Sequence, residues 1–269
     1  MKFVLSFLFA LLYLRNKNAF AFIEDNIESR IIGGKVAKPA QFPFMAALKI
    51  KTPSVEYSCG GALIHENWIL TSALCLYQAN NITVNLGSNS LEEYDPNRVH
   101  RFVESSDSTV IIHPDFDATA LKNDIGLIYI TTRVPLSENV QTIKLASMNL
   151  PTILKATALG WGQTSDANTT LAPELRYVTV DIITNLECKA TFGSQITENM
   201  VCVRGSNIEG PCYGDTGGPL VVRPLGSPVV EHVGISTFFS GNGCESEDPS
   251  GYTRTFPYVK WIEETVNNK

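Results

Sequence analysis

The sequence lacks the features that place a protein in a membrane, on nucleic acid or around a zinc ion. Its apolar run from Phe3 to Leu14 is too short to span a bilayer, and no other segment is long and apolar enough. Acidic residues outnumber basic ones by 27 to 21, which argues against nucleic acid and anionic membranes as partners. No cysteine pair has Cys-x-x-Cys spacing and the four histidines are scattered, so zinc is not expected.

Internal repeats and low-complexity segments are also missing. Charged residues make up 18% of the chain and hydrophobic residues 44%, a balance that supports a packed core and does not indicate disorder. The length of 269 residues suits one large all-β domain or two small ones.

The N-terminal residues are typical of a secreted precursor. Lys2 precedes the apolar run, and Ala19-Phe20-Ala21 fits a small-x-small cleavage site. We predict a signal peptide over residues 1–21 and a secreted, extracellular protein. Six cysteines in a secreted chain imply disulfides, and the sequence alone leaves 15 pairings open.

Short apolar segments separated by turns predict many β-strands. Within one of them, Val178, Val180 and Ile182 alternate with polar residues, as in a half-buried strand. Many short strands favour barrels or a sandwich. The predicted strands are Phe44–Leu48, Ile69–Ser72, Ile82–Leu86, Val110–Ile112, Ile125–Ile130, Ala156–Gly160, Leu175–Ile182, Leu220–Val222 and Val229–Ile235.

Two helices interrupt this pattern. Thr184 and Glu187 form a capping box, and Gly193 lies near a plausible helix end. Pro257 begins a C-terminal helix with one apolar face. That face carries Tyr258, Trp261, Ile262 and Val266.

A glycine-rich segment over residues 210–220 carries the strongest signal. It reads Gly-Pro-Cys-Tyr-Gly-Asp-Thr-Gly-Gly-Pro-Leu, a composition that allows a tight turn with backbone N–H groups facing a ligand. It resembles the Gly-Asp-Ser-Gly-Gly-Pro signature of trypsin/chymotrypsin-like serine proteases. Four further motifs match that family: Arg30-Ile31-Ile32-Gly33-Gly34, Cys59-Gly60-Gly61-Ala62-Leu63-Ile64, Trp68-Ile69-Leu70-Thr71-Ser72-Ala73-Leu74-Cys75 and Asn123-Asp124-Ile125-Gly126-Leu127.

The resemblance covers residues 31–269, and the stretch from Thr237 to Arg254 is most similar to arthropod chymotrypsin-like and collagenase-like members. It implies an all-β fold of two antiparallel six-stranded barrels, with a short intermediate helix and a C-terminal helix. The implied parts are a propeptide over 22–30, barrels over about 31–140 and 141–255, and a helix over about 257–267. The implied disulfides are Cys59–Cys75, Cys188–Cys202 and Cys212–Cys244.

The resemblance also implies activation by proteolysis. A protease would cleave after Arg30, and the freed Ile31 amine would pair with Asp215. In the family this pairing orders the oxyanion turn, whose N–H groups come here from Gly214 and Thr216.

The catalytic positions implied by the resemblance are Leu74, Asp124 and Thr216. The family has a histidine base where this chain has Leu74, and a serine nucleophile where it has Thr216. Leucine cannot accept a proton, and an internal threonine lacks the N-terminal amine that activates known threonine nucleophiles. None of the four histidines is well placed in the sequence to replace the base. The buried Asp124 then needs another donor, for which Thr237 is the candidate.

The resemblance also places a specificity pocket at Gly210, Thr237, Phe239 and Ser250. Gly210 stands where trypsin-like members have an aspartate, and Phe239 replaces a glycine, so its ring is expected to obstruct the pocket. We therefore expect a secreted, monomeric pseudoprotease that binds a protein, a peptide or a protease inhibitor. Two alternatives remain open: a weakly active endopeptidase using Thr216, and a secreted storage or structural protein.

Two further features concern modification and metals. Asn81 and Asn168 begin glycosylation sequons, of which Asn168 is the better placed. Acidic residues lie where some family members bind calcium, but their spacing gives no clear ligand set and a solvated loop is expected. No cofactor is predicted. These acidic residues are Glu92, Glu93 and Asp95.

Overall fold

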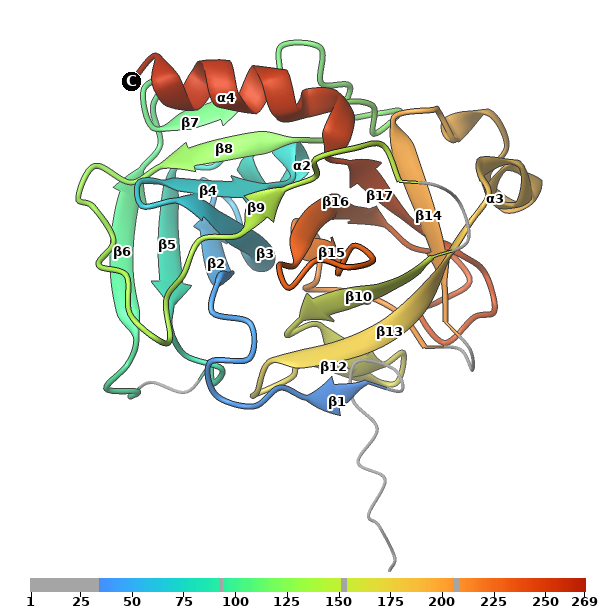
Figure 1. Cartoon of the computed structure of the whole chain (residues 1–269), viewed down its shortest axis with the longest axis horizontal. Coiled ribbons are helices and arrows are strands. Elements are labelled where there is room, and N and C mark those ends of the chain that lie inside the picture. The colour runs from blue at the N-terminus through green and yellow to red at the C-terminus, as the bar shows by residue number, and fades with distance from the viewer. Residues whose placement is uncertain (1–33, 92–93, 151–153, 206–208) are drawn as a thin grey trace, which may run out of the picture.

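The computed structural model describes residues 34–91, 94–150, 154–205 and 209–269. Most of these residues form two antiparallel β-systems that lie side by side (Figure 1). The described strands of the first follow the order β6-β5-β2-β3-β4-β8-β7. Their bounds are β2 Met45–Lys51, β3 Glu56–His65, β4 Trp68–Thr71, β5 Asn81–Leu86, β6 Val99–Glu104, β7 Val110–Ile112 and β8 Gly126–Tyr129.

The first system forms because its strands alternate between buried and exposed residues. In β5 the residues Ile82, Val84 and Leu86 are buried, while the residues between them are half-buried. These side chains join Leu48 and Ile50 of β2 in one apolar cluster that removes hydrocarbon from water. The system differs in one detail from a six-stranded barrel, since its described part has seven strands and ends at β6 and β7.

The second system is closed. Its strands follow the order β13-β10-β15-β16-β17-β14, and β14 pairs again with β13. The predicted two-barrel architecture is therefore confirmed. The strands are β10 Lys155–Gly160, β13 Arg176–Ile183, β14 Met200–Arg204, β15 Pro219–Val222, β16 Glu231–Phe238 and β17 Ser250–Arg254, with β11 Gln163–Ser165 and β12 Asn168–Leu171 as a separate hairpin.

Two short strands extend the second barrel, and the first of them comes from the N-terminal half of the sequence. β1 (Lys35–Val36) pairs with β13, although we assigned residues 31–140 to the first barrel. β9 (Lys144–Leu145) runs parallel to β16.

The predicted helices are present. α3 (Asn185–Phe192) begins with the Thr184–Glu187 capping box and is followed by Gly193, whose φ is 58°. A 3₁₀ turn over Phe256–Tyr258 leads into α4 (Val259–Asn267). α4 lies along the first barrel beside β7 and β8 (Figure 1), and its Ile262 packs against the cluster that contains Trp68. The remaining helices are α2 (Ala73–Leu76) and a 3₁₀ turn over Gly193–Gln195.

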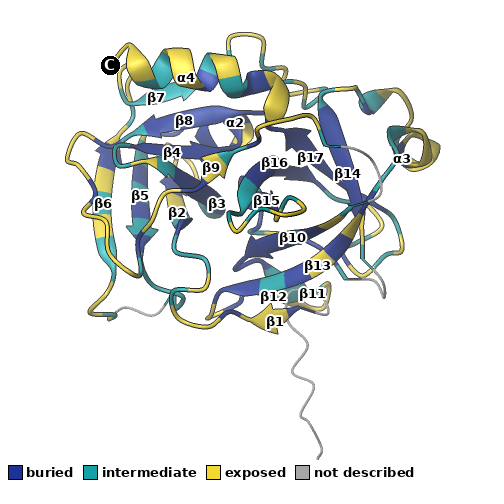
Figure 2. Cartoon of the chain, in the orientation of Figure 1, coloured by how far each residue is buried: buried dark blue, intermediate teal, exposed yellow. Residues whose placement is uncertain are grey.

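Three disulfides join the pairs implied by the family resemblance: Cys59–Cys75, Cys188–Cys202 and Cys212–Cys244. Figure 2 shows the strands of both barrels as mostly buried, with exposed residues on loops and on α4. The described part of the chain contains no helix long and apolar enough to cross a membrane.

The two barrels meet at the glycine-rich segment. The Gly60 amide in β3 donates to the Thr216 carbonyl at 2.8 Å. A Cβ atom on Gly60 would lie 2.6 Å from the Gly218 Cα atom, so the approach requires glycine at this strand position. The contact brings the Asp124 and Leu74 side of the first barrel to the turn of the second.

Candidate active site

The glycine-rich segment forms the predicted tight turn. Gly214 and Gly217 have φ values of 97° and 82°, which disfavour a residue with a Cβ atom. The Gly217 amide donates to the Ser236 carbonyl at 2.8 Å and anchors the turn to β16. The amides of Gly214 and Thr216 donate to no described residue, so both are available to a ligand oxygen.

Asp215 is buried behind this turn. Its two carboxylate oxygens accept hydrogen bonds from the amides of Gly162 at 2.7 Å and Cys212 at 2.9 Å. A Cβ atom on Gly160 would lie 1.9 Å from Asp215 Oδ1, so glycine is needed beside the carboxylate. Burial raises the pKa of Asp215 to about 7, against the opposing effect of the two amides. Its implied partner Ile31, and the cleavage residue Arg30, lie outside the described residues.

Asp124 is the second carboxylate of the site and is fully buried. Its Oδ1 atom accepts from the Ser72 hydroxyl at 2.6 Å and from the Leu74 amide at 2.8 Å. Its Oδ2 atom has no hydrogen-bond partner in the described part of the chain. Burial raises the pKa of Asp124 to about 6, and the Ser72 and Leu74 donors oppose this increase.

The expected donor to Asp124 is therefore corrected. We proposed Thr237, whose proximity does help to lower the pKa of Asp124. The Thr237 hydroxyl is, however, directed to the Ile235 carbonyl at 3.1 Å, and it also contacts the Thr253 hydroxyl at 3.0 Å. Ser72 is the short-range donor. Sequence reasoning passed over Ser72, although its position two residues before the missing base is a usable signal.

The base position carries no proton acceptor in its side chain. Leu74 lies in α2 and is 36% exposed. Ser72 caps the N-terminus of this helix, and its hydroxyl accepts from the Leu74 amide at 3.1 Å. The segment is thus held in place by Ser72 and Asp124, with a leucine facing outward from the family's histidine position.

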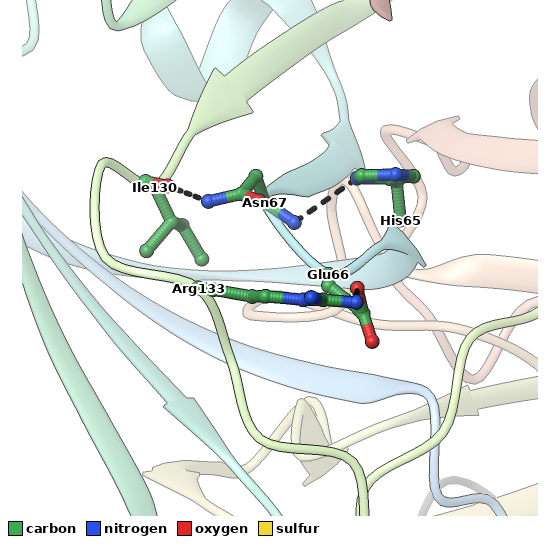
Figure 3. A network of polar contacts seen from close by, with 5 residues as sticks. All are labelled: His65, Glu66, Asn67, Ile130 and Arg133. Atoms are coloured by element: carbon green, nitrogen blue, oxygen red, sulfur yellow. Dashed lines mark hydrogen bonds and ion pairs between the residues drawn. The ribbon is translucent and has the colours of Figure 1, made fainter.

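Two histidines lie on the outer parts of the first barrel. His65 ends β3, where it accepts from the Asn67 amide at 3.3 Å beside the Glu66–Arg133 ion pair (Figure 3). His100 lies within 3.0 Å of the Asn85 side-chain oxygen on the neighbouring strand. Neither contacts Asp124 or Thr216.

The other two histidines are also engaged elsewhere. His113 packs edge-to-face against Tyr258 with ring centroids 5.3 Å apart. His232 is fully buried in β16, and its Nδ1 atom lies 2.8 Å from the Thr255 hydroxyl. Burial lowers the pKa of His232 to about 3. All four histidines are described residues, and none reaches the nucleophile position.

The nucleophile position, Thr216, is half-buried between the barrels. Its hydroxyl makes no hydrogen bond to a described residue, while its carbonyl accepts from the Gly60 amide at 2.8 Å and lies 3.5 Å from the Cys75 sulfur. A β-branched side chain restricts χ1. The site thus retains a hydroxyl beside two free amides, without a base.

A hollow of about 550 Å³, counting space open to solvent, lies next to the turn. Gly214 lies at its edge, and Trp161 and Leu171 give it apolar surface. Lys49 and Asn85 add polar groups from the first barrel. It is large enough for a side chain or a short stretch of peptide.

Contacts are known for two parts of the predicted pocket. Gly210 is buried next to Ser250, and Phe239 lies half-buried at the end of β16. The Phe239 ring packs edge-to-face against Tyr213, with centroids 4.6 Å apart. Tyr213 was missed in the sequence analysis, although it lies directly before Gly214. Its exposed fraction of 55% is a signal that appears only in the structure.

The acidic residues considered for calcium give no described site. Glu92 and Glu93 lie outside the described residues, and Asp95 accepts from Ser88 and from the Asn97 amide. A compact group of potential ligands occurs at Asp166, Cys212 and Cys244. Both cysteines are bonded to each other, so they are not thiolate ligands.

A family profile described as Trypsin matches residues 31–262. The chain belongs to the trypsin family. It is 34% identical to brachyurin of Leptuca pugilator over 87% of this chain and 97% of that protein. It is 34% identical to a collagenase of Hypoderma lineatum over 99% of this chain and 98% of that protein, and 31% identical to human serine protease 1 over 89% and 90%.

Solved structures agree with this membership. The chain matches a structure titled HL collagenase with a TM-score of 0.76 and 33% identity, over 88% of this chain and 98% of that one. The likeness of this chain to arthropod chymotrypsin-like and collagenase-like members is thereby confirmed. Membership in the family accounts for the fold described above.

Proposed function

We propose that this trypsin-family protein is a secreted pseudoprotease that acts by binding proteins or peptides in its cleft. The observation that carries the proposal is the rebuilt surrounding of Asp124. Ser72 and the Leu74 amide satisfy one carboxylate oxygen, and the side chain at position 74 cannot take a proton. Thr216 then has no base to remove its proton, which is the step that makes a hydroxyl nucleophilic.

The expected loss of rate is large. Removing the nucleophile or the base of such a triad lowers turnover by roughly 10⁶, and the two losses do not add. Oxyanion stabilisation and binding alone can retain about 10³–10⁴ over the uncatalysed reaction. A weakly active endopeptidase using Thr216 is therefore the second candidate, and it is favoured by the free Gly214 and Thr216 amides.

Binding is supported by features that do not depend on a catalytic base. The two free amides can hold a carbonyl oxygen of a bound chain, and the adjacent hollow offers apolar surface from Trp161 and Leu171. Protein inhibitors that insert a loop into family members are the natural class of probe. A storage protein would need neither feature, and we keep it as the third candidate.

Processing and modification complete the proposal. We propose secretion after removal of residues 1–21, cleavage after Arg30 by another protease, and the monomer as the acting form. Asn168 is exposed on the β11–β12 hairpin, whereas Asn81 is half-buried at the start of β5. We therefore favour Asn168 as the glycosylated residue.

The test measures initial rates on a broad peptide pool after cleavage at Arg30. Wild type is compared with Leu74→His, Thr216→Ser and the double variant. We expect wild type and both singles near background and the double well above their sum, since the triad acts as a unit. Wild type as fast as the double variant would falsify the proposal. Isothermal calorimetry with an inhibitor of the family then measures binding by wild type without turnover.

A further inference from the structure

An exposed aromatic ring lies on the first barrel, in the strand that ends its described sheet. In β6 the side chain of Val103 is buried, whereas His100, Phe102 and Glu104 are exposed. Phe102 is 64% exposed. A single exposed apolar side chain is ordinary on a protein surface, so its meaning depends on the groups around it.

A hollow of about 780 Å³, counting space open to solvent, lies beside this ring. Its walls come from β6, from the loop that follows β6 and from the end of β8, and we call it the β6 hollow. Phe102 and Tyr129 give it two aromatic rings. Its volume is in the range of small-molecule sites, and it shares no lining residue with the hollow next to the oxyanion turn.

Three hydroxyls in the wall of the β6 hollow are free to bind a ligand. Those of Ser105, Tyr129 and Thr131 make no hydrogen bond to another described residue, and none of them is cut off from solvent. A hydroxyl can both donate and accept, as can each hydroxyl of a sugar. The C–H groups on the face of a pyranose ring are apolar, and they leave water when the ring stacks on an aromatic side chain.

The charges around the β6 hollow favour a neutral ligand. Glu104 is the charged residue in its described lining. The Arg101 guanidinium lies at one end, where it donates to the carbonyls of His100 at 2.9 Å and of Thr132 at 3.3 Å. The Lys269 ammonium lies 4.8 Å from the ring centroid of Tyr129. An anion would therefore meet Glu104, and a cation would meet Arg101 and Lys269.

A glycosylation sequon lies on the neighbouring strand, in register with the β6 hollow. β5 and β6 lie side by side (Figure 1), with Asn81 opposite Glu104 and Thr83 opposite Phe102. Directly opposite residues of such a pair have Cβ atoms about 4.5–5.5 Å apart on the same face. A sugar chain on Asn81 would thus begin beside the hollow. Such chains begin with β-1,4-linked N-acetylglucosamine, which is neutral.

We propose that the β6 hollow binds β-1,4-linked N-acetylglucosamine, with one sugar ring stacked on Phe102. Glu104 and the free hydroxyls of the wall bind the hydroxyls of the sugar. The same chemistry has two sources, a chain attached to Asn81 and a free chain of these sugars from outside. The site lies on the first barrel and does not rest on the function proposed for the cleft.

The first experiment titrates triacetylchitotriose into an Asn81→Gln background, which carries no sugar at position 81, and follows the amide shifts of residues 102–109. We expect saturable shifts. Phe102→Ala should weaken binding at least fivefold and Glu104→Ala several-fold, whereas Phe102→Tyr keeps the ring and should bind as the background does.

The matched controls are Tyr94→Ala and Glu138→Ala, which remove an exposed ring and an exposed carboxylate elsewhere and should leave the affinity unchanged. Glycerol, which has hydroxyls but no ring face, should give no saturable shift. Thermal unfolding verifies that each variant is folded. Absence of saturable shifts with the trisaccharide, equal affinity of Phe102→Ala and the background, or the same response to glycerol overturns the proposal.

The second experiment identifies the source on protein secreted by a eukaryotic host. Mass spectrometry of glycopeptides measures occupancy of Asn81, and calorimetry measures binding of the same trisaccharide. If the attached chain is the ligand, wild type carries sugar on Asn81 and does not bind the trisaccharide, while Asn81→Gln does. If the ligand comes from outside, wild type and Asn81→Gln bind equally. Asn168→Gln is the control and should not change binding. No turnover is measured, so these results are independent of the pseudoprotease proposal.

Discussion

Two buried carboxylates, Asp215 and Asp124, have differently built surroundings. Asp215 keeps a setting made of backbone amides and of glycines that leave room for it. Asp124 accepts from one side chain, the Ser72 hydroxyl, and from the Leu74 backbone amide, and the Leu74 side chain stands where the family has a histidine. The proposed function thus keeps the half of the site that shapes a binding turn and, in the half that would move protons, has Leu74 in place of a base; we call these the retained half and the rebuilt half.

The two carboxylates also differ in how fully their oxygens are hydrogen-bonded. Burial raises the pKa of both groups, to about 7 for Asp215 and about 6 for Asp124. Both oxygens of Asp215 accept hydrogen bonds, whereas one oxygen of Asp124 has no partner in the described part of the chain. A buried carboxylate with an unused oxygen retains the ability to orient a donor. The rebuilt half is therefore reversible in principle, and the comparison can be tested from both sides.

The largest expected effect is on hydrolysis. The Leu74→His/Thr216→Ser variant should exceed wild type by at least about 10³ in turnover, because triad losses approach roughly 10⁶. Adding Asp215→Asn to this variant should remove most of the gain, since the oxyanion turn loses its buried charge. Initial rates on a peptide pool measure both steps. If Asp215→Asn leaves the gain in turnover intact, the turn behind which Asp215 is buried is not needed for hydrolysis, and the proposed division of the site is wrong.

The next effect is on stability at the retained half. Gly160→Ala should lower the free energy of unfolding by about 3 kcal/mol, in the range for overpacked cores. The new methyl would lie 1.9 Å from Asp215 Oδ1, and the carboxylate could move away only by losing its amide donors. Gly241→Ala is the matched control, because a Cβ atom there meets nothing within 4 Å. Urea unfolding of both variants gives the difference, and equal stabilities would show that the glycine is not required.

A third prediction concerns the pH dependence of stability at the rebuilt half. A carboxyl whose folded pKa of about 6 exceeds its unfolded value takes up a proton on folding. The contribution of this carboxyl to the free energy of unfolding is fully present below about pH 4 and is lost as the pH rises through about 6. Asp124→Asn should therefore gain stability relative to wild type between pH 4 and 7, by up to about 3 kcal/mol.

Asp215 titrates in both proteins, so its contribution cancels in this comparison. Urea midpoints across the pH range provide the measurement. Ser72→Ala is the companion variant: loss of the donor should raise the pKa of Asp124 further and shift the curve to higher pH. A flat difference between wild type and Asp124→Asn would mean that Asp124 is not held with a raised pKa.

The sequence predicted the architecture because its signals are local and repeated. Alternation in Val178–Ile182, the capping box at Thr184 and the apolar face of α4 each specify an element without reference to distant residues. The prediction missed strands that contain glycine at positions of close packing, because such residues weaken the sequence pattern of a strand. β3 contains Gly60 and Gly61, which are there for close approach to other segments, and β17 begins with Ser250 and Gly251.

The sequence analysis assigned site positions by family resemblance and did not give their contacts. Resemblance to the family singled out Leu74, Asp124 and Thr216, because each lies within an unbroken sequence motif. The Ser72 donor and the Tyr213–Phe239 pair depend on side-chain directions that spacing does not reveal. Thr237 was assigned as donor to Asp124 because the family has a serine there, but its added methyl accompanies a hydroxyl directed to Ile235.

The smallest expected effect is on amide exchange: cleavage after Arg30 should change it near Asp215 and leave it unchanged near Asp124. Cleavage after Arg30 would free an amine that pairs with Asp215, stabilise its charged form and order the turn that follows. Amide exchange over residues 214–218 should slow by about tenfold, equivalent to roughly 1.4 kcal/mol of local stabilisation. The amides of Ser72 and Leu74 should exchange at the same rate before and after, because no new charge reaches Asp124. Arg30→Gln treated with the same protease is the control for incidental cleavage. Equal slowing at both carboxylates would show that activation orders the whole cleft, and no slowing at either would show that the retained half is no longer a switch.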